Sequence, residues 1–186
     1  MKLNANYWIK FSIVNLVIIA LLGVLMRYKI GFDFPYLTQK NILHAHSHFA
    51  FSGWITHSIY VLLIYFVTNA ITSNYHKQYR FILITNLGCA YGMLISFFFT
   101  GYSFISIALS TLTIINSCFL TYYLFKDFKK IEIFHPSINW FKAAMCFNLI
   151  SSVGTFYLAY MMASRNFNEH WYLASVYFYL HFQYNG

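Results

Sequence analysis

Six apolar runs, each close to the length that crosses a membrane, constrain this chain more than any other feature. They cover residues 8–26, 43–67, 81–99, 102–125, 138–162 and 170–186. A helix needs roughly 20 apolar residues to span the hydrocarbon core of a bilayer. Backbone groups in lipid must bond within the chain, so only helices or closed barrels cross it. Since the sequence lacks the alternating pattern of a barrel, we predict an all-α polytopic transmembrane bundle of about six helices, forming one domain over residues 1–186.

The composition supports a protein embedded in a lipid bilayer. The chain is 60% hydrophobic and 9% charged, whereas soluble domains carry roughly 25% charged residues. Its net charge of +8 does not indicate nucleic-acid binding, because the basic residues lie near the ends of the runs and form no stripe. Basic residues in such positions set membrane topology, and cytoplasmic connections hold more of them.

The connections predict the orientation. Both prolines, Pro35 and Pro136, fall between runs, and Gly101 is predicted to form a tight turn. One set of connections holds six basic residues (Lys2, Lys77, Arg80, Lys126, Lys129, Lys130) and the other holds four (Arg27, Lys29, Lys40, Arg165). The larger set lies on the side of the N-terminus, which predicts a cytoplasmic N-terminus.

Three histidines, His44, His46 and His48, stand at the start of the second run. Ionisable side chains inside a membrane segment are costly and usually functional. At about 100° per residue, His44 and His48 share a helix face, His46 points roughly 160° away, and His57 returns to within about 20° of His46. One metal taking all three would require the helix to unwind. Two faces predict two roles, for instance a haem ligand on one face and a second-site or hydrogen-bonding histidine on the other.

Plainer interpretations of the same residues remain open. The three histidines can be solvated at the helix mouth, and one interhelical hydrogen bond would satisfy His57. Gly53 would let a ring or a neighbouring helix approach the backbone closely. Polar residues such as Asn86 and Asn148 are predicted to hold helices together.

A second group of polar residues lies in the last run. His181 is predicted to be buried, with Gln183 and Asn185 beside it, as a metal ligand or as part of a polar knot between helices. Glu169 and His170 are expected at the interface and solvated. His76 and His135 fall in polar connections.

The segment from Leu43 to Trp54, together with His181, resembles subunit I of the haem–copper oxidase superfamily. The tail from His181 to Gly186 is similar to the nitric oxide reductase helix, although Asn185 stands in place of its glutamate. The resemblance implies a bacterial inner-membrane protein of the respiratory chain that transfers electrons to O2 or NO. It implies an axial haem ligand at His44 or His46, and His181 as a ligand of copper or non-haem iron.

The chain also departs from that family. The triplet His44, His46, His48 replaces the usual single histidine, and the ligands of helices seven and ten would lie beyond Gly186. The last run holds 17 residues (170–186) without a polar flank, so we expect the chain to continue or to pair with a downstream half or other respiratory subunits. Whether it is an enzyme therefore stays open. The alternative is a non-catalytic metal-handling protein in which the triplet binds copper or zinc. His57 and His181 are separate candidate metal ligands.

Overall fold

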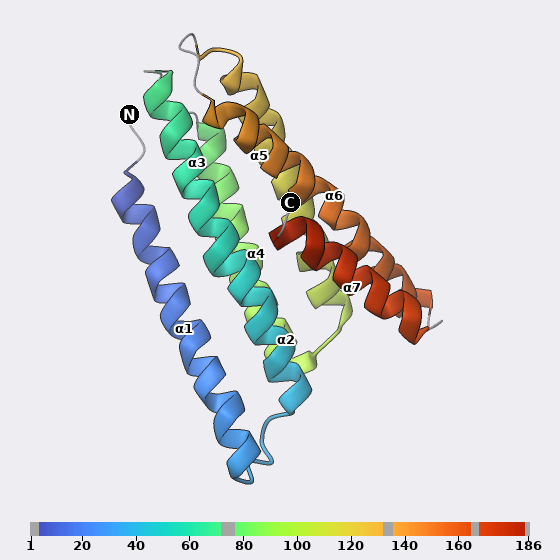
Figure 1. Cartoon of the computed structure of the whole chain (residues 1–186). Coiled ribbons are helices and arrows are strands. Elements are labelled where there is room, and N and C mark those ends of the chain that lie inside the picture. Colours follow the sequence, from blue (N-terminus) through green and yellow to red (C-terminus); the bar gives the residue numbers. More distant parts are fainter. Residues whose placement is uncertain (1–3, 72–76, 132–135, 165–167, 185–186) are drawn as a thin grey trace. The chain divides into compact units, whose positions relative to one another are not determined.

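The computed structural model describes residues 4–71, 77–131, 136–164 and 168–184, and their secondary structure is helical, without strands. The helices are α1 (Ala5–Gly31), α2 (Gln39–Phe49), the π-helix η1 (Ala50–Thr56), α3 (His57–Ala70), α4 (Lys77–Thr100), α5 (Phe104–Phe128), α6 (Ser137–Ser164) and α7 (Glu169–Tyr184) (Figure 1). Because α2, η1 and α3 follow one another without a break, the described chain has six continuous helices. The prediction of an all-α bundle of about six helices is confirmed.

Each predicted run corresponds to one helix, and the helices extend further at most ends. Hydropathy marks the part of a helix that suits lipid and misses its polar ends, as at Lys77 in the first turn of α4. The fourth run is the exception at its start. Tyr102 and Ser103 belong to the turn before α5, where the Ser103 hydroxyl accepts a hydrogen bond from the Ser106 backbone N–H at 3.4 Å. A serine in that position caps the start of a helix.

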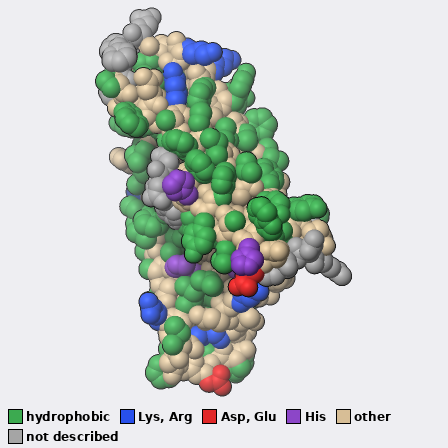
Figure 2. Space-filling model, turned by 45° about the vertical axis from the view of Figure 1, so that its right-hand side comes forward, with side chains coloured by type: hydrophobic (Ala, Val, Ile, Leu, Met, Phe, Trp, Pro, Cys, Tyr) green, Lys and Arg blue, Asp and Glu red, His purple; other side chains and the backbone are tan. Residues whose placement is uncertain are grey.

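Five of the described helical segments are long and apolar enough to cross a membrane: Ala5–Gly31, Gln39–Ala70, Lys77–Thr100, Phe104–Phe128 and Ser137–Met162. Hydrophobic side chains also cover much of the surface visible in Figure 2. Phe104, for example, is 87% exposed. Large apolar side chains on the outside cost little where lipid replaces water. These features are compatible with an integral membrane protein.

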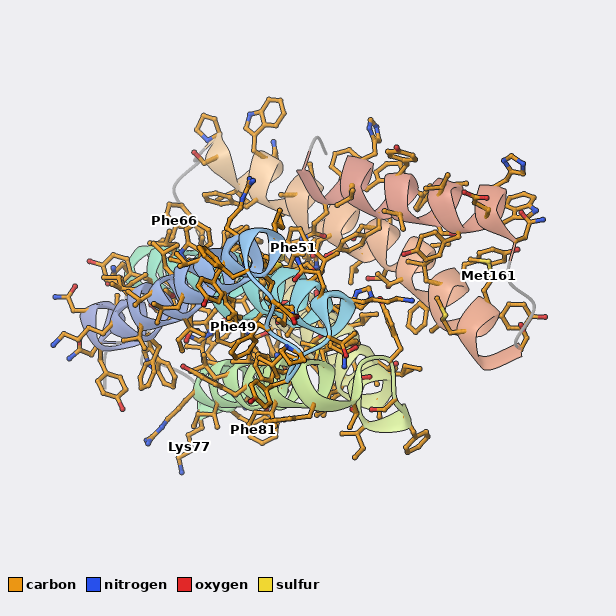
Figure 3. All side chains as sticks on the ribbon, turned by 90° about the horizontal axis from the view of Figure 1, so that it is seen from below. Phe49, Phe51, Phe66, Lys77, Phe81 and Met161 are labelled. Atoms are coloured by element: carbon orange, nitrogen blue, oxygen red, sulfur yellow. The ribbon has the colours of Figure 1, made fainter. Side chains whose placement is uncertain are left out.

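The chain divides into two compact units, residues 1–116 and 117–186, and the division falls within α5. In the first unit α1, the continuous helix α2–η1–α3 and α4 lie side by side (Figure 1). Phe49 is fully buried between them, in contact with Ile19 of α1 and Ala90 of α4 (Figure 3). The core of this unit therefore lies beside the start of η1.

The Lys29 side chain bonds two backbone carbonyls in the connection between α1 and α2. The Lys29 ammonium donates to the backbone carbonyls of Phe34 and Leu37, each at 2.5 Å.

Gly101 has a φ of +64°, which confirms the predicted tight turn between α4 and α5. A Cβ at Gly101 would lie 2.7 Å from Oδ1 of Asn41. The first turn of α2 is thus fixed against the α4–α5 turn, which positions the histidines that follow.

In the second unit α6 and α7 form an antiparallel pair. The Ser151 hydroxyl donates to Oε1 of Gln183 at 2.9 Å, and the rings of Phe147 and Phe182 lie 5.9 Å apart. A Cβ at Gly154 would lie only 2.6 Å from the Ser175 carbonyl oxygen, so the two backbones approach closely. Small residues at helix contacts allow this in membrane proteins.

Candidate functional site

The three histidines predicted from the sequence, hereafter the histidine triplet (His44, His46 and His48), lie on α2. This helix follows Thr38 and is α-helical throughout Gln39–Phe49. The helix does not unwind at the triplet, so the three rings project in the directions that α-helical geometry gives them. Among the described residues no group of three or more His, Cys, Asp or Glu side chains could hold one metal ion. The expectation that one metal cannot take all three histidines agrees with this geometry.

His44 and His48 share a face and contact the same two aromatic side chains. The His48 ring stacks on Phe97 of α4, with ring centroids 4.2 Å apart and an interplanar angle of 13°. The His44 ring meets Tyr102 edge to face at 4.6 Å. The Tyr102 hydroxyl lies 3.5 Å from Nε2 of His48, whereas Nε2 of His44 is buried and no described residue bonds it.

His46 faces α1 instead. Among the described residues outside the local α1 backbone, only its Cε1 atom lies within 4 Å of the place where a Cβ would stand at Gly23, at a distance of 3.7 Å. Because Gly23 has no side chain, this imidazole lies directly against the α1 backbone. Nδ1 of His46 is buried and has no hydrogen-bond partner among the described residues. The triplet thus has two faces, as the sequence predicted.

The helix that carries His57 differs from the one that the sequence predicted. The sequence prediction assumed one unbroken α-helix from 43 to 67, which put His57 on the His46 face. Ala50–Thr56 is instead a π-helix, η1. A π turn bonds residue i to i+5 and so takes about one more residue than an α turn. One extra residue turns everything after it by about 100°. The angle of about 20° predicted between His46 and His57 assumed a regular α-helix and therefore does not apply, although both side chains contact α1, His46 at Gly23 and His57 at Trp8.

His57 is fully buried, and its neighbours come from two other helices. The Trp8 ring of α1 lies 6.1 Å from the imidazole, centroid to centroid. Nδ2 of Asn86 on α4 lies 3.4 Å from Nδ1 of His57. This contact matches the plainer interpretation of His57 as an interhelical hydrogen-bonding residue. Its candidacy as a metal ligand stays a prediction, and one that this hydrogen bond does not favour.

His181 is exposed on α7, which differs from the burial that its position predicted. The reason is that α7 turns other residues toward α6. Gln183 bonds Ser151 across that contact, and Ser175 is buried there. Glu169 and His170 are exposed, as expected. Asn185, His76 and His135 lie outside the described residues.

Sequence reasoning missed three side chains around the histidines: Asn15, Phe97 and Tyr102. Asn15 lies inside the first apolar run, together with Lys10 and Ser12, and an amide there was a usable signal. It is fully buried, and its Nδ2 donates to the Gly53 carbonyl at 2.5 Å. Phe97 and Tyr102 gave no such signal, because aromatic residues are common throughout this chain. Asn86 and Asn148 do link helices, through the Ser52 carbonyl and the Ser117 hydroxyl.

The Phe49 ring, on the same continuous helix, leaves no room for a side chain at Gly53. A Cβ at this position would lie 2.8 and 2.9 Å from two ring atoms of Phe49. Phe49 is fully buried and cannot move without disturbing the core. We therefore expect Gly53→Ala to destabilise the protein by about 1–3 kcal/mol, the usual cost of overpacking, as measured by unfolding in detergent.

Gly88→Ala is the matched control, because no described residue beyond the local α4 backbone lies within 4 Å of a Cβ at Gly88. It is expected to stabilise the helix by about 0.5–1 kcal/mol. Adding Phe49→Leu to Gly53→Ala should cost less than the two single changes together. Equal effects of Ala at 53 and 88 would contradict the proposed contact.

The fold and the site define a polytopic α-helical protein with spanning-length helices and histidines placed on two faces of one of them. No protein family, curated protein or solved structure matches this chain.

Proposed function

We propose that this chain is a haem-binding integral membrane protein and that His46 is an axial ligand of the haem iron. The observation that carries the proposal is that Nδ1 of His46 is buried and bonds no described residue. The His46 ring lies against Gly23, where α1 has no side chain. A buried polar atom without a partner is costly, more so away from water. If one nitrogen of this imidazole bound the haem iron and the other had a hydrogen-bond partner, that cost would be removed.

The face of His44 and His48 supports haem binding less well. Both rings already contact Tyr102, and His48 stacks on Phe97. A macrocycle would have to displace these aromatic contacts. Haem supplies one-electron chemistry when bound, and its potential depends on the axial ligand and on burial. The role of the chain would be to bind the iron through His46 and to exclude water around it.

The wider proposal follows the resemblance to subunit I of haem–copper oxidases. The protein would lie in a bacterial inner membrane with a cytoplasmic N-terminus and would transfer electrons to O2 or NO together with a downstream half or other respiratory subunits. His181 would ligate copper or non-haem iron. Its exposure on α7 leaves the imidazole accessible to a ligand outside the α6–α7 pair.

A second candidate function rests on a different face. His44 and His48 are four residues apart on one helix face, the spacing with which helical histidine pairs bind zinc. The Tyr102 oxygen lies 3.5 Å from Nε2 of His48, and Nε2 of His44 is free to ligate. Imidazole suits zinc and copper alike. This pair supports a metal-handling role in which no haem takes part.

Haem content of purified variants separates the two functions. We expect wild type to show a Soret band and His46→Ala to lose at least nine-tenths of its haem in a pyridine haemochrome assay. His44→Ala and His48→Ala should keep most of it, which makes them matched controls on the same helix. Loss of haem in His44→Ala alone would overturn the assignment of His46. A wild type without a Soret band that binds zinc or copper, and loses it in His44→Ala, would favour the metal-handling function.

A further inference from the structure

The outward face of α5 within the second unit changes from aromatic to basic toward the end of the helix. Phe119 and Tyr122 are 55% and 63% exposed, and Lys126, in the last turn, is exposed as well. Residues three and four apart lie on one helix face, so these side chains form a single stripe. Leu120 and Leu124, on the other face, are fully buried. The stripe therefore faces away from the protein core.

The length of α5 places the basic end of this stripe at the membrane surface. The helix has 25 residues, which at 1.5 Å per residue gives about 38 Å. The hydrocarbon core of a bilayer is roughly 30 Å thick, so part of α5 must extend beyond it. Lys126 and the exposed Lys129, which follows directly after α5, belong to this polar end. Tyr122 lies about one turn deeper, at the level where tyrosine side chains gather in membrane proteins.

A third lysine at this end is held by a carboxylate. The Lys130 ammonium donates to Oδ1 of Asp127 at 2.6 Å. Asp127 is only 4% exposed, so this bond draws the Lys130 charge toward the core side. Among the described residues, neither Lys126 nor Lys129 forms an ion pair. Two positive charges are therefore left uncompensated beside the aromatic stripe.

The end of α5 is also packed against the start of α6. The Phe128 ring stacks on Phe141, with ring centroids 6.4 Å apart and an interplanar angle of 15°. Phe128 is buried. The backbone that carries Lys126 and Lys129 is thus held in place by the core of the second unit. Binding at these two lysines requires only their side chains to become ordered.

We propose that the end of α5 is a binding site for one anionic phospholipid. The Lys126 and Lys129 ammonium groups contact the phosphate, and the Tyr122 hydroxyl donates to the ester region below it. An acyl chain lies along Phe119. A juxtamembrane basic group attracts anionic lipids, whereas a zwitterionic lipid brings a cation of its own to the two lysines. The proposal is independent of haem binding.

The stripe favours a lipid over a free phosphate ion as the occupant. Exposed lysines gain little from a single ion in water, because solvent screens the contact. A lipid adds apolar contact along Phe119 and Tyr122, which are exposed in this structure. The predicted topology places this end of α5 on the cytoplasmic side, and the cytoplasmic leaflet is the one that carries negative surface charge. The bound lipid would hold the end of α5 at that surface.

Native mass spectrometry of the full chain in detergent, titrated with phosphatidylglycerol or phosphatidylcholine, tests the proposal. We expect wild type to bind the first phosphatidylglycerol at least about tenfold more tightly than phosphatidylcholine. Lys126→Gln and Lys129→Gln should each weaken phosphatidylglycerol binding about fivefold, the contribution of one basic side chain near an anionic surface. The double variant should bind both lipids alike. Lys40→Gln is the matched control, an exposed lysine in the first turn of α2 that the predicted topology places on the other side.

Asp127→Asn gives a prediction of opposite sign. Removing the carboxylate charge releases the Lys130 ammonium, which adds a third uncompensated cation to the site. Phosphatidylglycerol should then bind about two- to fivefold more tightly than to wild type. Helical circular dichroism checks that the variant is folded, and if it is not, the Lys126 and Lys129 variants decide the question.

Three outcomes would overturn the proposal. Equal affinity of wild type for the two lipids would show that the site does not select an anionic headgroup. An effect of Lys40→Gln as large as that of Lys126→Gln would reduce the binding to a general attraction by net charge. Displacement of phosphatidylglycerol by an excess of inorganic phosphate, at constant ionic strength, would identify the occupant as a free phosphate ion.

Discussion

Replacing Asn15 with leucine is expected to destabilise the first unit by about 2–6 kcal/mol. The side chain is fully buried and joins two helices to α1. Its Nδ2 donates to the Gly53 carbonyl of η1, and its Oδ1 accepts from the Tyr91 hydroxyl of α4 at 2.6 Å. Leucine keeps the volume but leaves both partners unsatisfied, at about 1–3 kcal/mol each. Unfolding in detergent, followed by helical circular dichroism, measures the loss.

A double-mutant cycle isolates the contact. Tyr91→Phe removes the hydroxyl, so Asn15→Leu should cost about 1–3 kcal/mol less in that background, because one partner is no longer left unsatisfied. Asn139→Leu is a matched control on an exposed position of α6 and should change stability by less than about 0.5 kcal/mol. An Asn15→Leu variant as stable as Asn139→Leu would show that Asn15 does not hold the π-helix.

Replacing Gly154 with alanine should open the α6–α7 pair. The added Cβ would lie 2.6 Å from the Ser175 carbonyl oxygen and 3.1 Å from the Tyr179 nitrogen. Both are backbone atoms, so no side-chain rotation relieves the overlap and α7 must shift as a whole. We expect a loss of at least about 1–3 kcal/mol, the range for overpacking, which is opposite in sign to the gain expected for Gly88→Ala.

Thiol crosslinking measures the separation directly. Ser151 and Gln183 lie in hydrogen-bond contact across the pair, so cysteines at these two positions should be joined by a short bifunctional thiol reagent in a background without native cysteines. Adding Gly154→Ala should reduce the crosslinked fraction at least fivefold, whereas adding Gly88→Ala should leave it unchanged. Equal crosslinking in both backgrounds would rule out the proposed backbone contact.

The helices could be predicted because their cause is local. In lipid, the backbone N–H and C=O groups of a run such as 81–99 can form hydrogen bonds only with each other. Composition and length therefore decide that the run forms a helix. The two faces of the histidine triplet follow from the same local rule, because the helical period is fixed by the backbone. His44, His46 and His48 therefore point where the sequence predicted.

The burial of individual histidines could not be predicted in this way. His57 and His181 both lie in apolar runs, yet one is fully buried and the other is exposed. Which residue faces a neighbouring helix depends on where the close contacts fall, such as Gly154 against Ser175. Such contacts join residues far apart in the sequence.

The sequence by itself determined an all-helical, lipid-suited chain and a histidine triplet split between two faces of one helix. The tertiary structure alone decided that the helix carries a π segment at Ala50–Thr56, directly before His57. The physical reason is that a π turn breaks the regular i to i+4 hydrogen-bond pattern of the backbone. It is retained where side chains from other helices bond the carbonyls at the break. Here Asn15 and Asn86 supply those groups from α1 and α4, and no pattern within residues 50–56 specifies them.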